Sequence, residues 1–307
     1  MQRKHYCLTL NPSIMFQRFY KSILLAIFTF LCLCEIVVGC GDDENEENVQ
    51  YVSSNNNADN GSSEKDDKDG TNGEGFIRDG QNKIYTVNGV SFKMIYVEGG
   101  TFQMGIGSEY DSTHEVTLSD YNIGETEVTQ ELWIAVMGNN PSYFIGDSQC
   151  PVECITWDEC QNFISKLNKL TGETFLLPTE AQWEYAARGG NKSKGHSYSG
   201  GFRLENLSWY RDNSDGTTHR VKTKASNELG IYDMSGNVFE WCSDWHGSYS
   251  IYPTIGVKDP IGPATGSYRV RRGGSWCRSS MYCMVDRRGA SEPAKGSYEV
   301  GFRLASL

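Results

Sequence analysis

Apolar residues recur at helical spacing in only three places along the chain. A capping box that starts at Thr156 predicts a helix that ends at Gly172. The apolar face of this helix is expected to carry five side chains, Cys160, Phe163, Ile164, Leu167 and Leu170. A second capping box at Thr179 predicts a shorter helix that ends at Gly189, and a third helix is expected over 128–137. Helix is therefore a minor part of the predicted fold.

Strand patterns are also short. Segments 92–97, 101–104 and 301–304 are typical of strands, and Gly, Asn, Asp and Ser separate the remaining apolar pieces. Much of the chain after residue 80 is then irregular loop, whose backbone N–H and C=O groups need partners. Aromatic stacking, side-chain hydrogen bonds, metal ions or disulfides are expected to supply that order.

The first forty residues are typical of an export signal. Basic residues precede an apolar run over 23–38, which only Glu35 interrupts. The run ends in Val-Val-Gly-Cys, which resembles a bacterial lipobox and predicts that Cys40 becomes the lipidated N-terminus. Met15 is an alternative start, because 15–40 alone forms a complete signal. A transmembrane anchor is the competing interpretation, although Glu35 would be costly inside a bilayer. We therefore assign 1–39 as a lipoprotein signal peptide.

Segment 40–79 is predicted to be a disordered tether after the lipidated cysteine. Residues 41–79 hold 12 acidic and 3 basic residues, and almost no apolar residue lies between Val52 and Phe76. Such a composition cannot bury enough surface to offset the entropy of ordering. The acidic residues directly after Cys40 also resemble surface-export signals of some diderm bacteria, and a plain solvated linker is equally compatible with them.

The charge of the remaining segment excludes one class of partner. The whole chain carries a formal charge of −11, yet residues 80–307 hold 26 acidic and 21 basic residues. A nucleic-acid binder needs a net basic face to neutralise phosphates. We therefore expect no nucleic-acid partner.

Several short motifs follow one another in a fixed order after residue 92. They occupy 101–105, 127–129, 151–157, 177–190, 229–241, 244–245, 272–276 and 301–303. As an ordered set they closely resemble the formylglycine-generating enzyme family, also called sulfatase-modifying factors. The resemblance covers nearly all of 92–307 and implies a single compact, loop-rich α+β domain over 80–307. Its fold would be related to C-type lectins, with few short helices and short antiparallel strands.

The resemblance also implies a catalytic centre, from which this chain departs. Active members of the family bind copper(I) through two cysteines, three and eight positions after the serine of a Gly-Gly-Ser motif, and oxidise a sulfatase cysteine to formylglycine. Counted from Ser275, the eighth position is Cys283, but the third is Arg278. Cys277 lies one position early, and adjacent residues of an extended segment point to opposite faces. Copper(I) prefers soft thiolates, whereas a guanidinium offers no lone pair. Cys277 and Cys283 are therefore catalytic candidates only if the chain is an oxidase.

The cysteines also fit purely structural roles. Region 41–307 contains six of them, Cys150, Cys154, Cys160, Cys242, Cys277 and Cys283. An even count in an exported chain is typical of disulfides, so a bridge between Cys277 and Cys283 is the alternative to a metal or redox pair. Cys160 is expected to belong to the core.

A calcium site is implied for the loop before Trp241. Asp233, Glu240 and the carbonyls of Ser235, Gly236 and Val238 match positions that hold calcium in relatives. Calcium takes six to eight oxygen ligands, and a tight loop with carboxylates can supply them. The alternative is a turn held by Asp and Asn side chains that bond to their own backbone. We favour a structural calcium ion.

Aromatic and basic residues in the loops are either a recognition surface or part of a loop-rich core. The set comprises Trp209, Tyr210, Trp241, Trp245, Trp276, Tyr282, Arg269, Arg271, Arg287 and Arg288. Two functions follow. The favoured one is a lipoprotein of the bacterial cell envelope, held at the outer membrane or cell surface by acylated Cys40, that binds an unidentified protein or glycan. The alternative is a copper-dependent oxidase of sulfatase cysteines.

Overall fold

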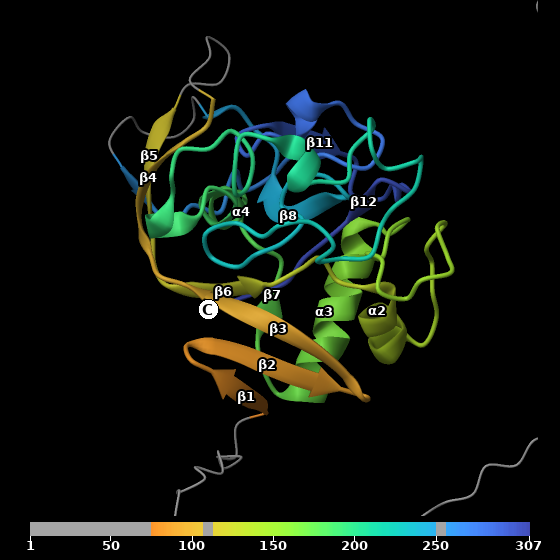
Figure 1. Ribbon diagram of the computed structural model, residues 1–307. Coiled ribbons are helices and arrows are strands. Elements are labelled where there is room, and N and C mark those ends of the chain that lie inside the picture. The colour runs from red at the N-terminus through yellow and green to blue at the C-terminus, as the bar shows by residue number, and fades with distance from the viewer. Residues whose placement is uncertain (1–74, 107–112, 250–255) are drawn as a thin grey trace, which may run out of the picture. The chain divides into compact units, whose positions relative to one another are not determined.

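The computed structural model describes residues 75–106, 113–249 and 256–307 (Figure 1). The predicted signal peptide, Cys40 and most of the predicted tether lie outside the described residues. Within the described ranges, no helix is both long enough and apolar enough to cross a membrane.

The N-terminal part of the fold is a six-stranded sheet in which all neighbouring strands are antiparallel. Its strands, in spatial order, are β1 (Phe76–Asp79), β2 (Asn82–Val87), β3 (Val90–Val97), β6 (Tyr121–Gly124), β13 (Ala305–Ser306) and β7 (Phe175–Leu176). The predicted strand at 92–97 is therefore β3. Strand β1 begins at Phe76, before the predicted domain start at residue 80, because Phe76 packs against Tyr85 of β2 with ring centroids 5.2 Å apart.

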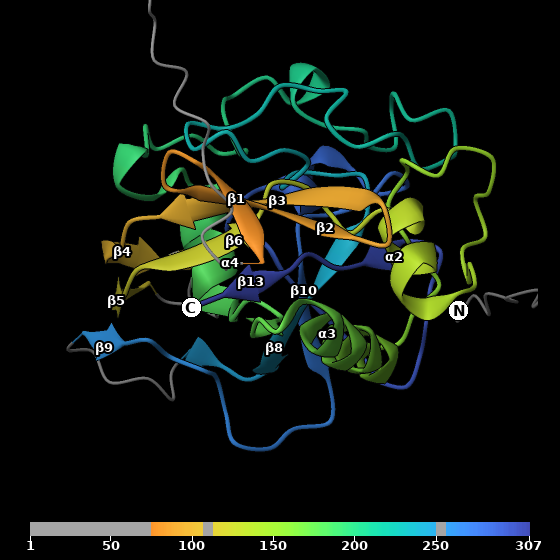
Figure 2. The same cartoon turned by 90° about the horizontal axis from the view of Figure 1, so that it is seen from below.

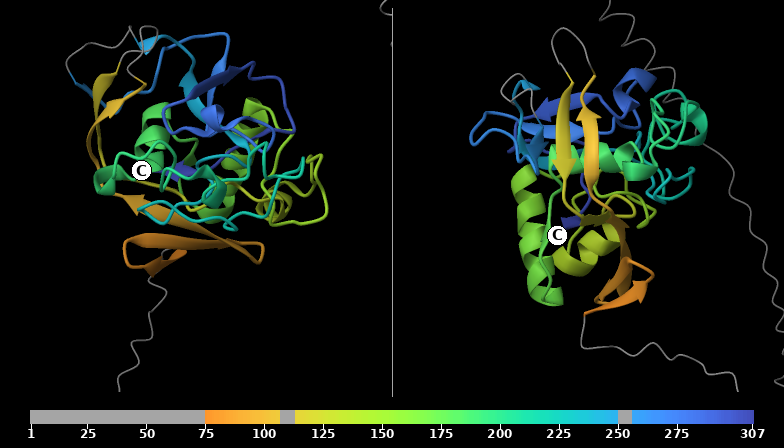
Figure 3. Two further views of the ribbon diagram at one scale, coloured as in Figure 1. Left: turned by 45° about the horizontal axis from the view of Figure 1, so that its top comes forward. Right: turned by 90° about the vertical axis from the view of Figure 1, so that its left-hand side faces the viewer.

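Two smaller sheets complete the β-structure. One has the order β11 (Arg288–Ser291), β10 (Arg269–Arg272), β8 (Phe239–Trp245) and β12 (Val300–Gly301), and the other the order β4 (Gly100–Met104), β5 (His114–Leu118) and β9 (Val257–Lys258). The pairs β8–β12 and β5–β9 are parallel, unlike the remaining pairs. The β4–β5 hairpin is the yellow pair of strands in the right-hand view of Figure 3, and β4 confirms the predicted strand at 101–104.

The predicted strand over 301–304 is wrong after its first residue. Gly301 ends β12, and the chain joins the six-stranded sheet only at Ala305. Phe302, Arg303 and Leu304 are all buried between these two strands. Their consecutive burial cannot occur in a strand with one solvated face, because strand side chains alternate between faces. This segment links two sheets instead.

The three predicted helices are present as α2 (Gln130–Met137), α3 (Trp157–Thr171) and α4 (Glu180–Ala187). Thr156 and Thr179 both form complete capping boxes, and Gly172 ends α3 with a left-handed backbone. One face assignment is wrong, because Leu170 is 52% exposed. At about 100° per residue, Leu170 lies at the edge of the apolar stripe rather than in it.

The helices divide the core into two clusters. Helices α2 and α3 cover the six-stranded sheet, as Figures 1 and 2 show, and Trp133 of α2 stacks on Phe163 of α3 with ring centroids 5.2 Å apart. Helix α4 packs with the two smaller sheets, where Trp183 is fully buried. The long segment between α4 and β8 contains no strand among the described residues and runs over this second cluster as irregular loops (Figure 3).

Candidate functional site

A buried ion pair lies where β8 meets the segment after β12. Nε and Nη2 of Arg303 donate to the two carboxylate oxygens of Glu240, each at 2.6 Å, and neither side chain is exposed to solvent. The remaining donors of Arg303 reach the carbonyls of Gly124 and Tyr232 at 2.9 and 3.0 Å. Charge pairing outweighs the effect of burial, so the pKa of Arg303 is raised. Arg303 thereby ties the 233–240 loop to the six-stranded sheet.

The 233–240 loop depends on one glycine. Gly236 has a φ of 92°, and a Cβ atom there would lie 1.9 Å from Ser208 Oγ and 2.4 Å from the Trp209 carbonyl oxygen. Only glycine fits such a close approach with a left-handed backbone. Glu127 holds the same loop from the other side, because its carboxylate accepts from the Val238 amide at 3.0 Å and from Asn237 Nδ2 at 2.8 Å. Hydrogen bonds to the Glu127 side chain therefore hold this part of the loop in place, instead of the backbone hydrogen bonds of a sheet.

The predicted calcium ligands are in different surroundings. Both oxygens of Glu240 accept from Arg303, and Oε2 accepts in addition from Trp183 Nε1 at 2.6 Å. Asp233 is buried with a φ of 60°, and its Oδ2 accepts from the Lys222 amide at 2.9 Å while its Oδ1 has no hydrogen-bond partner. Burial raises the pKa of Asp233 to about 6. Asp233 thus keeps an oxygen for a cation and Glu240 does not, and calcium binding stays a prediction.

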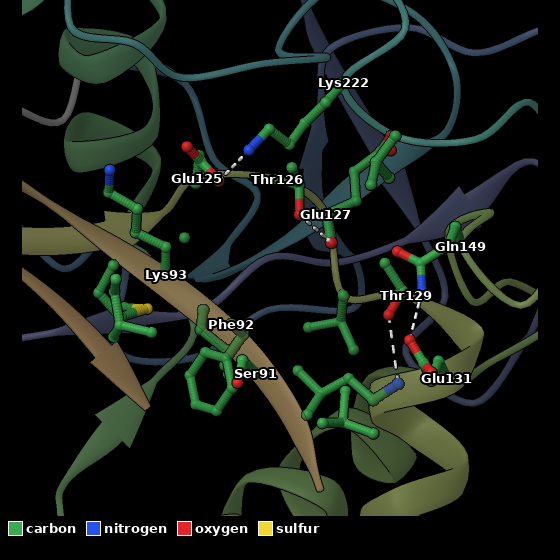
Figure 4. A pocket seen from close by; sticks show the side chains of 18 residues that line it. Ser91, Phe92, Lys93, Glu125, Thr126, Glu127, Thr129, Glu131, Gln149 and Lys222 are labelled. Carbon is green, nitrogen blue, oxygen red and sulfur yellow. Dashed lines mark hydrogen bonds and ion pairs between the residues drawn. The ribbon is translucent and has the colours of Figure 1, made fainter. Parts of the chain in front are cut away.

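A small cavity of about 250 Å³ lies beside this loop (Figure 4). Lys222 and Glu125 line it side by side and form an ion pair at 2.7 Å (Figure 4). Lys93 at the other side pairs with Asp79 of β1. These charged groups are already paired, so the cavity offers a polar recess rather than a reactive centre.

The Ser275–Cys283 segment holds the catalytic candidates. Arg278 Nε donates to Glu299 Oε2 at 2.7 Å, and Arg278 Nη2 donates to Glu299 Oε1. The Cys277 thiol donates to the same carboxylate at 3.1 Å and lies 3.5 Å from Ser275 Oγ. Charge-assisted bonds of this bidentate kind are the strong ones, and they hold the pKa of Glu299 below its usual value against the effect of burial. Glu299, which lies outside this segment, therefore holds Ser275, Cys277 and Arg278 together, and no sequence motif pointed to it.

Cys283 lies apart from that carboxylate network. It is buried against Leu204 and Tyr210 at the end of a 3₁₀ turn, Ser280–Cys283. A Cβ on Gly274 would lie 2.7 Å from the Cys283 sulfur, so this turn packs directly on the Gly-Gly-Ser backbone. Burial raises the pKa of Cys283 to about 12 and also raises that of Cys277, which favours neutral thiols.

The other cysteines are thiols as well. All six cysteines in the described ranges are free, so the structure contains no bridge between Cys277 and Cys283. Cys160 is fully buried in the core, as predicted. Among the described residues, no group of three or more His, Cys, Asp and Glu side chains is arranged to hold a metal ion.

Four rings form an aromatic patch, and one of them, Tyr298, directly precedes Glu299 in the chain; the patch consists of Tyr143, Phe144, Trp276 and Tyr298. Phe144 contacts Tyr143 and Trp276 edge-on, with centroids 5.0 and 5.1 Å apart, and Tyr298 lies 5.9 Å from Trp276. Tyr143 is 70% and Tyr298 50% exposed. Of this patch the sequence predicted only Trp276. Two other residues of the loop set named in the sequence analysis, Trp241 and Tyr210, are buried, which agrees with the core alternative for these two.

Comparison with known proteins identifies the family. The family model described as "Sulfatase-modifying factor enzyme 1-like domain" matches residues 86–306. The chain belongs to this family. The resemblance read from the ordered motifs and the predicted α+β, lectin-like fold class are both confirmed.

Individual relatives of this sulfatase-modifying factor domain carry different names. The chain is 34% identical over 240 residues to "Chaperone protein LppX" of Paenibacillus barcinonensis, covering 62% of this chain and 80% of the relative. It is 30% identical over 274 residues to the formylglycine-generating enzyme of Streptomyces coelicolor, covering 76% and 84%. The solved structure of Treponema denticola variable protein 1 superposes with a TM-score of 0.69 at 37% identity, covering 74% of this chain and 99% of that one.

Proposed function

We propose that this chain is a lipoprotein of the bacterial cell envelope whose sulfatase-modifying factor domain binds a partner and does not oxidise a cysteine. The observation that carries the proposal is the bidentate ion pair between Arg278 and Glu299. It occupies the position at which active relatives, by the resemblance, carry a copper-binding cysteine. A cation bound to a buried carboxylate cannot serve as a copper(I) ligand.

The donor set near Ser275 does not fit a site with two thiolates. Cys283 lies in an apolar cluster, whereas the Cys277 thiol donates to Glu299. Deprotonating Cys277 would place a second negative charge beside that carboxylate, which costs free energy. The two thiols are therefore in unlike surroundings, and we derive no oxidation step for this chain.

The aromatic patch supports a binding role. Tyr and Trp side chains are enriched at the energetic centres of protein interfaces. Tyr298 of this patch directly precedes Glu299, the partner of Arg278. The relative named a chaperone supports a non-catalytic, protein-binding role in the same family. We propose a protein as the partner and keep a glycan as the alternative.

The oxidase question can be tested with a variant that restores the family spacing. Arg278→Cys places cysteines three and eight positions after Ser275. The natural chain and Arg278→Cys are each reduced and mixed with copper(I), with bicinchoninate as the competing ligand. Each copper-loaded protein is then incubated under oxygen with a sulfatase-derived cysteine peptide. We expect Arg278→Cys to retain copper(I) at least about tenfold more tightly than the natural chain, because two thiolates bind this soft ion together. The natural chain is expected to leave the peptide mass unchanged.

The control is Cys283→Ser in the Arg278→Cys background, which should lose the gained affinity. If the natural chain converts the peptide thiol to an aldehyde, and Cys283→Ser abolishes this conversion, the binding proposal is wrong and the oxidase takes its place.

The binding role makes a separate prediction for the aromatic patch. A photoreactive p-benzoylphenylalanine at position 143 should give a discrete crosslinked adduct in the native host. The control is the same residue at position 268, where an exposed tyrosine lies outside the patch. Mass spectrometry of the adduct then distinguishes a protein from a glycan. Equal adducts at both positions, or none at 143, would show that the patch is not a docking surface.

A further inference from the structure

A second, larger cavity has a lining that includes neither Cys277, Cys283 nor any residue of the aromatic patch. Its volume is about 730 Å³, and it is bounded by the start of α3, the turn between β5 and β6, and the loop after β9. Figure 2 shows this loop, drawn in blue, running past β8 towards α3 before it joins β10. Cavities of this size bind drug-sized molecules in other proteins.

Arg269 of β10 forms the polar end of the cavity. Its guanidinium carbon lies 3.8 Å from the ring centroid of Trp157 and 3.6 Å from that of Trp245. Both indole rings therefore pack against the guanidinium. Both tryptophans also line the cavity. Stacking of this kind fixes the plane of a guanidinium and leaves the donors on its edge to bind a ligand.

The edge donors of Arg269 are incompletely used. Nη1 donates to the Ser243 carbonyl, whereas Nε is buried without a partner. Within the part of the chain that the structure describes, Nη2 has no acceptor and no carboxylate forms an ion pair with Arg269. By contrast, the neighbouring Arg271 and Arg272 of the same strand each lie within 4 Å of a carboxylate. Among the described residues Arg269 is thus a preoriented cation with no carboxylate at ion-pair distance, and Asp158 and Asp244 act on it only from farther away.

The rest of the lining is largely apolar and partly exposed. Ile261 is 74% and Leu176 43% exposed although both line the cavity, and Pro263 lies beside Ile261. Exposed apolar side chains that gather around a recess are typical of a ligand site.

Two carboxylates also line the cavity, and both have partners of their own. Asp259 accepts from the amide and hydroxyl of Ser119 at 2.7 and 2.8 Å. Asp120 accepts from the Gly99 amide at 2.8 Å and from the Tyr96 hydroxyl at 2.6 Å. These bonds stabilise the charged carboxylates, so neither depends on Arg269 for compensation.

We propose that this cavity binds a small amphiphilic anion, in which an apolar body carries one carboxylate or sulfonate group that pairs with Arg269. The apolar body would cover Ile261, Leu176 and Pro263. The anionic group would bind the edge of the guanidinium between the two indoles. The site does not depend on the aromatic patch or on Cys277 and Cys283.

The test compares two fluorescent probes with the same ring system. 8-Anilinonaphthalene-1-sulfonate is anionic, and N-phenyl-1-naphthylamine is its uncharged counterpart. Both are titrated into the full chain, where the apolar segment at 23–38 contributes the same background to every variant. We expect Arg269→Gln to weaken binding of the sulfonate about tenfold and to leave the affinity for the neutral probe within about twofold. The control is Arg211→Gln, which removes an exposed arginine outside the cavity and should change neither affinity.

A third variant tests the cavity itself and does not depend on the Trp–Arg–Trp stack. Ala264 lines the cavity, and Ala264→Trp should weaken both probes by filling it. Equal sulfonate binding by the natural chain and Arg269→Gln would overturn the assignment of the anion. Unchanged binding of both probes by Ala264→Trp would overturn the cavity as the site. If Arg269→Gln fails to fold, Arg269→Lys is used in its place. This variant retains the cation and should keep the affinity for the sulfonate probe within about threefold of the natural chain. Loss of sulfonate binding by Arg269→Lys would also contradict the proposal.

Discussion

Buried carboxylates in this domain differ in which partner compensates them. Glu240 is compensated by Arg303 and Glu299 by Arg278, whereas Glu127 accepts, among the described residues, only from an amide and an asparagine side chain, and burial raises its pKa well above the usual value. Removing one partner of a buried ion pair lowers the free energy of unfolding by about 3–5 kcal/mol, because the remaining charge stays buried without compensation. Arg303 and Arg278 therefore have parallel consequences for the two expected metal sites. Arg303 donates to both oxygens of Glu240, which the resemblance assigns to calcium, and Arg278 stands at one of the two positions that the resemblance assigns to copper-binding cysteines.

Asp233 is the residue at which the calcium proposal can be tested, because its Oδ1 has no hydrogen-bond partner. An ion that binds only the folded state stabilises it by mass action. We expect a chelator to lower the melting temperature of the natural chain and excess calcium to restore it. Asp233→Asn should abolish this response, whereas Asp212→Asn, at an exposed aspartate, should keep it. A melting temperature that is indifferent to chelator and calcium would refute the proposal.

At the scale of elements, the ends of the helices are defined by their caps. Thr156 Oγ1 accepts from the Glu159 amide at 3.1 Å, and Glu159 Oε2 accepts in return from the Thr156 amide at 2.8 Å. The side chain of the adjacent Trp157 is part of the Arg269 stack. The cap of α3 thus also helps to place one wall of the large cavity.

Thr156→Ala should lower the free energy of unfolding by about 1 kcal/mol, since it leaves the Glu159 amide without its acceptor. Urea denaturation at constant pH measures the change. Ser165→Ala in the exposed middle of α3 is the matched control and should alter the stability by less than about 0.5 kcal/mol. If both variants lose the same stability, the capping box contributes nothing specific.

At the scale of the whole molecule, anchoring and binding are the two halves of the proposed function. The anchor depends on Cys40 and its lipobox-like flank, which lie outside the described residues. An acylated cysteine followed by a polar tether would keep the domain near a membrane while leaving the aromatic patch accessible.

Replacing Cys40 with Ala should abolish incorporation of labelled palmitate and release the chain from the membrane fraction, because no lipid would then be attached. Cys34→Ala, in the apolar segment before it, is the control and should keep both label and membrane association. Unchanged membrane retention without lipid label in the natural chain would favour a transmembrane anchor instead.

Features that depend on near neighbours could be predicted from the sequence alone. The capping boxes at Thr156 and Thr179 act within one helical turn, so the starts of α3 and α4 follow from local spacing. The ordered motifs determined the family, and counting from Ser275 was enough to place Arg278 in the position of a copper ligand.

The tertiary structure alone decided the partners of the buried charged side chains and of the aromatic patch. Glu240 and Arg303 are 63 residues apart, Arg278 and Glu299 21 apart, and the aromatic patch joins Tyr143 to Tyr298. In a loop-rich fold, no periodic sequence pattern predicts such pairs, because packing between segments distant in the sequence brings the two side chains together. Arg269 could be read from the sequence only as one of several loop arginines. Its position between two indoles, without a carboxylate partner among the described residues, is a consequence of how α3 and β8 pack around β10.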